Sequence, residues 1–234
     1  MTAPVAGRVL VETVARCLGP LREEVAFLGG AATSLLLSDP AAPEIRSTID
    51  VDVIVEVASR IEYYRLAERL RALGFREVAE EGAPVCRWRV AGVLVDVMPT
   101  LPEVLGFSNR WYSEALATAS VYRMAEDLVI RLVTPPYFLA TKVEAFRSRG
   151  GGDYRASHDL EDIIAVLDGR PEVVSEIAGS KADLRQFLRD AFASFLSERA
   201  FLEAVPGHLP PDAASQARTP IVLERAREVA TLAP

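Results

Sequence analysis

The chain is poor in the side chains that most often hold metal ions or crosslink proteins. Its 234 residues include only two cysteines, Cys17 and Cys86, and two histidines, His158 and His208. So few thiols and imidazoles exclude a zinc cluster and provide no disulfide framework. This cysteine usage fits a reducing compartment, and we therefore expect a cytoplasmic protein.

Positive charge is also in the minority. The sequence has 26 lysines and arginines against 33 aspartates and glutamates, which gives a formal net charge of -7. This balance argues against nucleic-acid binding by bulk positive charge, although a local basic groove stays open. Half of the residues are hydrophobic, and the length suffices for a sizeable core, as in an ordinary globular protein.

Long apolar runs are missing as well. The longest uncharged run, 25–38, is shorter than the roughly 20 residues that span a bilayer, and it contains Gly29-Gly30. The first residues mix charges into an amphipathic helical pattern and lack the apolar stretch of a signal peptide. We expect neither a membrane span nor a targeting segment.

The hydrophobic pattern divides the chain near Thr134-Pro135-Pro136, which ends a strand and begins a helix. Before this point, strand and helix patterns alternate; after it, the pattern is mostly helical. The sequence therefore predicts an α+β protein with a first domain over 1–134 and a helical region over 135–234. The expected strands are 25–28, 50–55, 76–79, 85–90, 93–99, 121–124 and 128–132, and the expected helices are 5–18, 31–38, 59–74, 135–149, 157–169, 171–179 and 181–205, with a last short helix at the end.

Two carboxylates share one face of the expected strand 50–55. In "DVDVIV", Asp50 and Asp52 alternate with valines, as in a strand with one face on the core. Side chains at this spacing lie roughly 7 Å apart, and their oxygens suit one or two divalent ions of the Mg²⁺ type. The alternative is an edge strand whose aspartates face water.

A third carboxylate interrupts another apolar strand. Asp96 lies within "VLVDVMP", where a charge is costly unless it is paired or bound to metal. Three acids on adjacent strands suit a two-metal site, which activates an attacking oxygen and neutralises a departing pyrophosphate. The alternative is an ion pair between Asp96 and Arg87 or Arg89.

Residues near the first acid pair suit phosphate binding. Gly29-Gly30, between a strand and a helix, allows close approach of a phosphate to the backbone and to a helix N-terminus, although such turns are also common in structural roles. Arg46 and Thr48 could orient the phosphate or the acids. A surface arginine and a strand-forming threonine are equally natural at these positions.

The helical region contributes one basic outlier. Lys142 falls within the apolar stripe of 135–149, and Arg149 lies seven residues further on the same line. A stacked lysine and arginine suit a triphosphate, whereas the alternative for Lys142 is snorkelling to the surface. Asp159 borders the apolar stripe of the next helix, after the candidate N-cap Ser157, where the helix dipole alone favours an acid.

Taken in order, these motifs resemble the AbiEii-type nucleotidyltransferases of the DNA polymerase β-like nucleotidyltransferase superfamily. The resemblance covers about residues 25–170, and Ala31-Ala32 and Val53 depart from the usual pattern. It implies a mixed-sheet nucleotidyltransferase core flanked by helices. The matching residues are Gly29, Gly30, Arg46, Thr48, Asp50, Asp52, Asp96, Lys142, Ala145, Arg149, Gly150, Asp159 and Asp162.

The resemblance also implies roles for these residues. Asp50 and Asp52 would hold the catalytic Mg²⁺ or Mn²⁺, and Asp96 would complete the carboxylates or act as base. The remaining roles concern the nucleotide: Gly29 and Gly30 beside the phosphates, Arg46 and Thr48 around them, Lys142 and Arg149 on the triphosphate, and Asp159 in support.

The implied reaction moves a nucleoside monophosphate from an NTP to a tRNA or to a protein hydroxyl. The family suggests a toxin of a toxin–antitoxin or phage-defence system, with a cognate antitoxin protein as partner. Transfer to a small molecule such as an aminoglycoside, and a catalytically silent binding module, are the alternatives. Arg87 and Arg89 around Trp88, and Arg110 before Trp111-Tyr112, suit single-stranded RNA, or they only neutralise Asp96.

Overall fold

The computed structural model describes residues 6–80, 82–106, 108–149 and 152–233, which form two compact units. Unit 1 comprises residues up to 35 together with 46–134, and unit 2 comprises 36–45 together with 135 onward. The chain thus passes to unit 2 between Thr134 and Pro135. The segment 36–45, which lies within the predicted first domain 1–134, belongs to unit 2.

Unit 1 is built on a seven-stranded mixed sheet with the order β3-β4-β5-β2-β1-β7-β6. The pairs β2–β5 and β1–β7 are parallel and the other neighbours are antiparallel. The strands are β1 (Val25–Leu28), β2 (Asp50–Val55), β3 (Arg76–Glu77), β4 (Arg87–Val90), β5 (Val93–Pro99), β6 (Ser120–Ala125) and β7 (Leu128–Leu132). The predicted α+β class is confirmed.

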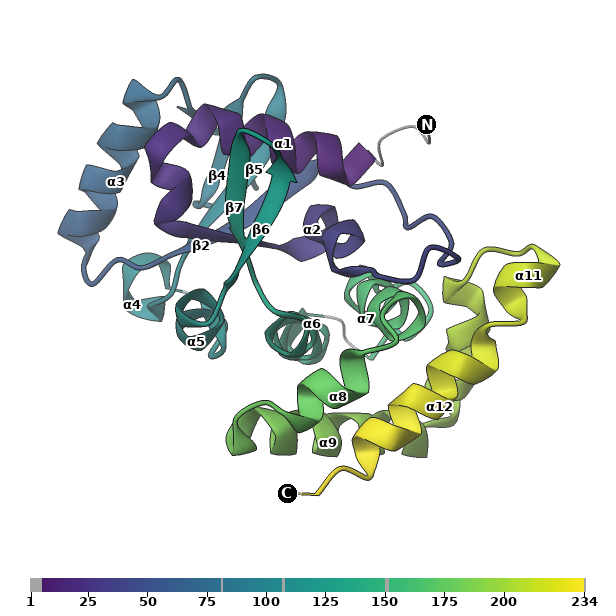
Figure 1. The fold of residues 1–234 in the computed structure, drawn as a ribbon. Helices are drawn as coiled ribbons and strands as arrows, with labels where there is room; N and C mark the ends of the chain where they lie inside the picture. The colour runs from purple at the N-terminus through teal and green to yellow at the C-terminus, as the bar shows by residue number, and fades with distance from the viewer. Residues whose placement is uncertain (1–5, 81, 107, 150–151, 234) are drawn as a thin grey trace. The chain divides into compact units, whose positions relative to one another are not determined.

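The helices of unit 1 flank this sheet. Helix α1 lies across one face of the sheet, where it packs against β2, β5 and β7 (Figure 1). Ser59 caps α3 by accepting a hydrogen bond from the Glu62 amide, as the sequence favours. The helical segments of unit 1 are α1 (Ala6–Leu18), η1 (Gly19–Glu23), α2 (Gly29–Leu36, which ends in unit 2), α3 (Arg60–Ala72), α4 (Pro102–Leu105) and α5 (Tyr112–Ala117).

The hairpin between β4 and β5 fixes the register of the acid-bearing strand. Ala91 and Gly92 both have positive φ, 47° and 82°, as a tight two-residue turn requires. This turn aligns Val90 with Val93 and therefore Arg87 with Asp96. The short helices α4 and α5 lie in the stretch 101–119, where the sequence shows no clear periodicity.

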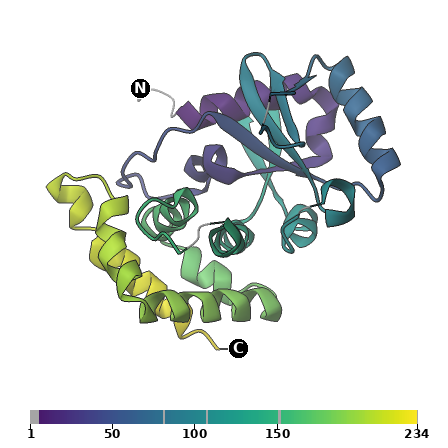
Figure 2. The ribbon, with the colours of Figure 1, turned by 180° about the vertical axis from the view of Figure 1, so that it is seen from behind.

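Unit 2 is helical. Helices α9 and α12 pack together and lie side by side in both views (Figures 1 and 2). Ser157 caps α7 by accepting a hydrogen bond from the Leu160 amide, which confirms the expected N-cap. The segments are α6 (Pro135–Arg149), α7 (His158–Gly169), α8 (Val173–Ala178), α9 (Ala182–Ser197), α10 (Arg199–Ala204), η2 (Val205–His208), α11 (Ala213–Gln216) and α12 (Thr219–Ala230).

In the part of the chain that the structure describes, no helix combines the length and apolar character that a bilayer crossing demands.

Candidate active site

Parallel pairing of β2 with β5 brings the three predicted carboxylates to one face of the sheet. Asp52 is the register partner of Asp96, and Asp50 precedes Asp52 by two positions. Because side chains alternate along a strand and register partners point the same way, all three acids share that face. The face is partly buried: Asp96 is 8% exposed, and Asp50 and Asp52 are intermediate.

An arginine joins two of these acids. The Arg87 guanidinium holds Asp96 with both ends, with Nε 2.8 Å from Oδ1 and Nη2 2.7 Å from Oδ2. The same Nη2 lies 3.1 Å from Oδ2 of Asp50. The hydrogen bond to Asp96 raises the pKa of Arg87 above its usual value. The arginine pairing that the sequence left open for Asp96 is therefore present, through Arg87; Arg89 instead contacts Glu80 at 3.4 Å.

Thr48 lies beside the first acid. Its Oγ1 donates a hydrogen bond of 2.9 Å to Oδ1 of Asp50, so the carboxylate is held from two sides, by Thr48 and by Arg87. Such contacts fix the orientation of a carboxylate before any ligand arrives. This hydrogen bond agrees with the expected role of Thr48 in orienting the acids, while its role toward a nucleotide stays a prediction.

The two glycines form the first turn of α2 and allow two side chains to approach its backbone. Gly29 has φ of 76°, and a methyl group added there would lie 1.7 Å from Oδ2 of Asp52. A methyl group on Gly30 would lie 2.8 Å from Nη2 of Arg46. The glycines therefore bring the β2 carboxylate and the Arg46 guanidinium against the start of a helix. The carboxylates and these four neighbours, Gly29, Gly30, Arg46 and Thr48, are called the carboxylate site below.

The carboxylate site has the right donor atoms for a hard divalent ion, but they are already engaged. Hard cations such as Mg²⁺ take carboxylate oxygens, which Asp50, Asp52 and Asp96 provide on one face. Both oxygens of Asp96 and one of Asp50 accept hydrogen bonds from Arg87. Among the described residues, no group of three His, Cys, Asp or Glu side chains is arranged to hold a metal ion. The three carboxylates have suitable oxygen ligands on one face of the sheet, and they could bind a metal ion if the Arg87 side chain moved away.

Cys86, next to Arg87, takes no part in this chemistry. It is 2% exposed, and burial, with a smaller contribution from Asp96, raises the pKa of its thiol to about 12. A buried thiol that stays protonated at neutral pH is a poor nucleophile.

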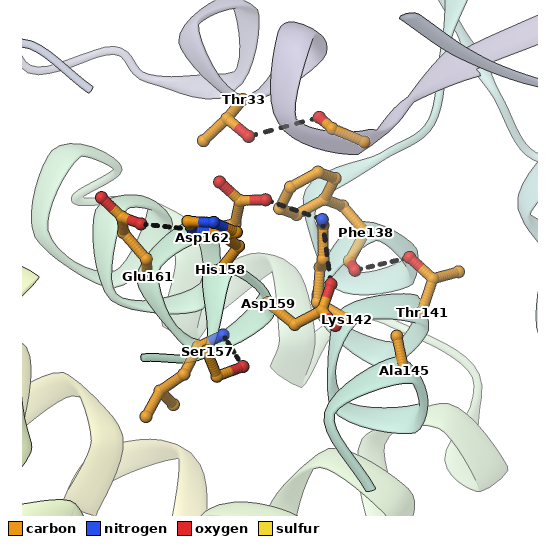
Figure 3. A network of polar contacts seen from close by, with 12 residues as sticks. Thr33, Phe138, Thr141, Lys142, Ala145, Ser157, His158, Asp159, Glu161 and Asp162 are labelled. Atoms are coloured by element: carbon orange, nitrogen blue, oxygen red, sulfur yellow. Dashed lines mark hydrogen bonds and ion pairs between the residues drawn. The ribbon is translucent and has the colours of Figure 1, made fainter. Parts of the chain in front are cut away.

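In unit 2, Lys142 is buried between two aspartates. Its Nζ lies 2.6 Å from Oδ2 of Asp162 and 3.2 Å from Oδ1 of Asp159, and 5.8 Å from the Phe138 ring centre (Figure 3). Lys142 is 8% exposed, so it does not snorkel to the surface. The resemblance implies a supporting role for Asp159 and includes Asp162 without a stated role, yet Asp162, at 2% exposure, is the more buried partner.

The other basic and aromatic candidates are placed less favourably for ligands. Trp88 is 1% exposed and Trp111 6%, so neither ring is open for stacking on a base. Arg110 lies over the Trp111 ring, with its guanidinium carbon 4.9 Å from the ring centre. Arg149 ends α6, but its side chain and Gly150 lie outside the described residues, and their predicted roles stay predictions.

Comparison with known proteins yields likeness in structure only. No profile of a known protein family matches the chain, and no curated sequence matches it. A nucleotidyltransferase-like antigenic protein from Paracoccidioides brasiliensis aligns with a TM-score of 0.50 and 22% identity, over 87% of this chain and 93% of that one. JHP933 from Helicobacter pylori aligns with a TM-score of 0.50 and 11% identity, over 98% of this chain and 94% of its own. The chain therefore has a nucleotidyltransferase-like fold.

Proposed function

We propose that this protein is a metal-dependent nucleotidyltransferase that moves a nucleoside monophosphate from an NTP to a hydroxyl group. The observation that carries the proposal is the set of three carboxylates on one sheet face, directly beside the Gly29–Gly30 start of α2. This arrangement in a nucleotidyltransferase-like fold combines oxygen ligands for a cation with a glycine turn at a helix N-terminus, a type of backbone that binds phosphates.

The chain's own residues would act as follows. Asp50 and Asp52 would hold Mg²⁺, with Thr48 orienting Asp50 through its hydrogen bond. The bound metal would neutralise charge on the departing pyrophosphate and lower the pKa of the attacking hydroxyl. Asp96 would complete the carboxylates or accept the proton of that hydroxyl. The helix start at Gly29 and Gly30 would bind phosphate oxygens through backbone amides.

Lys142 would bind the triphosphate, with Asp159 and Asp162 holding its ammonium in place. This assignment rests on the motif order in the sequence. Positioned charges of this kind stabilise a leaving pyrophosphate without reorganising during the reaction.

The acceptor we propose is a protein hydroxyl, in keeping with a toxin of a toxin–antitoxin or phage-defence system. Two of the arginines that could line an RNA groove are engaged within the protein: Arg89 pairs with Glu80, and Arg110 lies over the Trp111 ring. A small cationic acceptor is the second candidate, because a net charge of -7 attracts cations and repels RNA.

The test is incubation with each radiolabelled NTP, Mg²⁺ and a cell extract, followed by separation of labelled protein, RNA and small molecules. We expect label on protein with the wild type and none with Asp52→Asn, which should keep the fold because it removes like-charge repulsion. Asp127→Asn is the matched control, since Asp127 is an exposed acid of the same unit that pairs with Arg16. Activity in Asp52→Asn, or no label from any NTP, would contradict the proposal.

A further inference from the structure

Arg87 occupies the position that a cation would take between two of the site's carboxylates. It lies on β4 opposite Asp96 of β5, and its guanidinium contacts three carboxylate oxygens from β2 and β5. The side chain is 22% exposed, against 11% for Asp96 and 29% for Asp50. The ion pair is thus shielded from solvent but retains an open side.

A positive charge here solves a problem of the metal-free protein. Three carboxylates on neighbouring positions of one sheet face repel one another, and partial burial strengthens that repulsion. A guanidinium offers a planar fork that matches one carboxylate and still has a donor for a second. Arg87 therefore stabilises the carboxylate site in the absence of any bound ion.

The same contacts oppose metal binding. A cation that bridges Asp96 with Asp50 or Asp52 needs oxygens that now accept hydrogen bonds from Arg87. The backbone of β4 is held to β5 by the ladder from Arg87 to Val90, so release of these oxygens calls for rotation of the side chain and not of the strand. A long, partly exposed arginine has rotamers for such a movement.

We propose that Arg87 is an exchangeable counter-ion: it closes the carboxylate site in the resting protein, and a divalent cation gains the three carboxylates only when the Arg87 side chain swings away. The inference rests on the proposed metal-dependent function and adds that Arg87 competes with the metal ion for the carboxylates. Metal binding to the wild type is then weakened by the work of displacing Arg87, and it coincides with a change in that side chain.

The first test measures Mn²⁺ binding by electron paramagnetic resonance in the absence of nucleotide. We expect Arg87→Met to bind Mn²⁺ at least tenfold more tightly than the wild type at a site that Asp52→Asn removes. Arg89→Met is the matched control, because it removes the same charge two residues along the same strand from an arginine that pairs with Glu80; it should bind as the wild type does.

The outcomes separate this inference from the proposed function. Equal or weaker Mn²⁺ binding by Arg87→Met, in a protein with a wild-type circular dichroism spectrum, would overturn the role of Arg87 while leaving the nucleotidyltransferase proposal intact. Absence of a site in all variants would overturn both the inference and the metal dependence. Label transfer from NTP, measured separately, then decides whether any activity remains.

A second measurement follows the Arg87 side chain of the wild-type protein directly. The Nε–H group of Arg87 gives an NMR signal that can be assigned by its loss in Arg87→Lys, and its bond to Asp96 should slow exchange with solvent. Addition of Mg²⁺ should shift this signal and speed its exchange, while the Arg89 signal stays unchanged. Saturation with Mg²⁺ without a change at Arg87 would show that the metal binds elsewhere or beside the intact ion pair, and the proposal would be wrong.

Discussion

At the scale of single residues, two aspartates on one strand face are tolerated because each has specific neighbours. Asp50 accepts a hydrogen bond from Thr48 and contacts Arg87, and Asp52 lies against the backbone of Gly29. These contacts offset the repulsion and the poor strand propensity of aspartate. The neighbouring residues therefore accommodate the charge of the two aspartates, as a binding site for a cation or a phosphate requires.

Gly29 gives a direct test of this environment. Gly29→Ala should lower the free energy of unfolding by more than about 2 kcal/mol, because an alanine meets both a positive φ and the Asp52 carboxylate. Gly74→Ala is the control: Gly74 has φ of 87° after α3, yet nothing lies within 4 Å of an added methyl group. It should cost only about 1 kcal/mol of backbone strain.

Urea unfolding of the two variants measures the difference, and Mn²⁺ binding to each shows whether Asp52 has moved. Equal losses of stability in Gly29→Ala and Gly74→Ala would mean that the carboxylate moves aside freely, and that the close approach is not part of the site's construction.

At the scale of helices and strands, sequence periodicity predicts regular elements well and irregular ones poorly. The expected helix 135–149 has the bounds of α6, and 93–99 those of β5, because Pro135, the Ala91-Gly92 turn and clear periodicity delimit them. The expected helix 181–205 is instead divided into α9, α10 and the start of η2. Continuous hydrophobicity does not reveal where a chain must bend to pack.

The site follows the same division. The shared face of the three acids follows from strand alternation and could be predicted. The ion pair between Arg87 and Asp96 depends on the register of the hairpin, and the sequence alone left either Arg87 or Arg89 as the partner of Asp96. The burial of Asp162 could not be predicted, because helical periodicity places this residue away from the apolar stripe. Only the packing of α6 against α7 shows Asp162 buried beside Lys142.

The pair of α6 and α7 should depend on this buried ion cluster. Lys142→Met leaves Asp159 and Asp162 buried without their common cation, and it should lower the free energy of unfolding by about 3–5 kcal/mol. In a double-mutant cycle with Asp162→Asn, the two losses should fall short of additivity by at least about 1 kcal/mol.

The control cycle uses Arg199 and Glu203, an exposed ion pair on α10 of the same unit, with Arg199 90% exposed. Its coupling should stay below about 0.5 kcal/mol in urea unfolding. A Lys142–Asp162 coupling as small as that of the control would mean that the ammonium is not held by Asp162, and it would weaken the triphosphate assignment.

At the scale of the whole molecule, the division into units could be predicted only where the composition changes. The Thr134-Pro135-Pro136 break marks one passage. The return of 36–45 to unit 2 rests on single contacts, such as the Arg218 Nη2 atom 2.6 Å from Asp39 Oδ2 and the Ser38 hydroxyl 2.6 Å from Glu172 Oε2. Long-range side-chain contacts of this kind leave no pattern in a sequence.

The acceptor is also a question for the whole molecule, because it depends on how charge is distributed. A tRNA acceptor requires several lysines or arginines in contact with phosphates, and about six such contacts reduce affinity roughly 10³-fold between about 50 and about 200 mM salt. This chain has a net charge of -7, and Arg89 is paired with Glu80 within unit 1. We therefore expect a shallow salt dependence.

The measurement is the rate of label transfer against KCl concentration, with Mg²⁺ and NTP saturating so that only acceptor binding responds. We expect a decrease of less than about threefold between about 50 and about 200 mM KCl, since few counterions are released. Arg89→Gln and Arg110→Gln should each leave the rate nearly unchanged, for the same reason. A steep decrease of the transfer rate with salt, together with a lower rate in either variant, would instead assign tRNA as the acceptor. Arg89 and Arg110 would then have to leave Glu80 and Trp111 to contact the RNA.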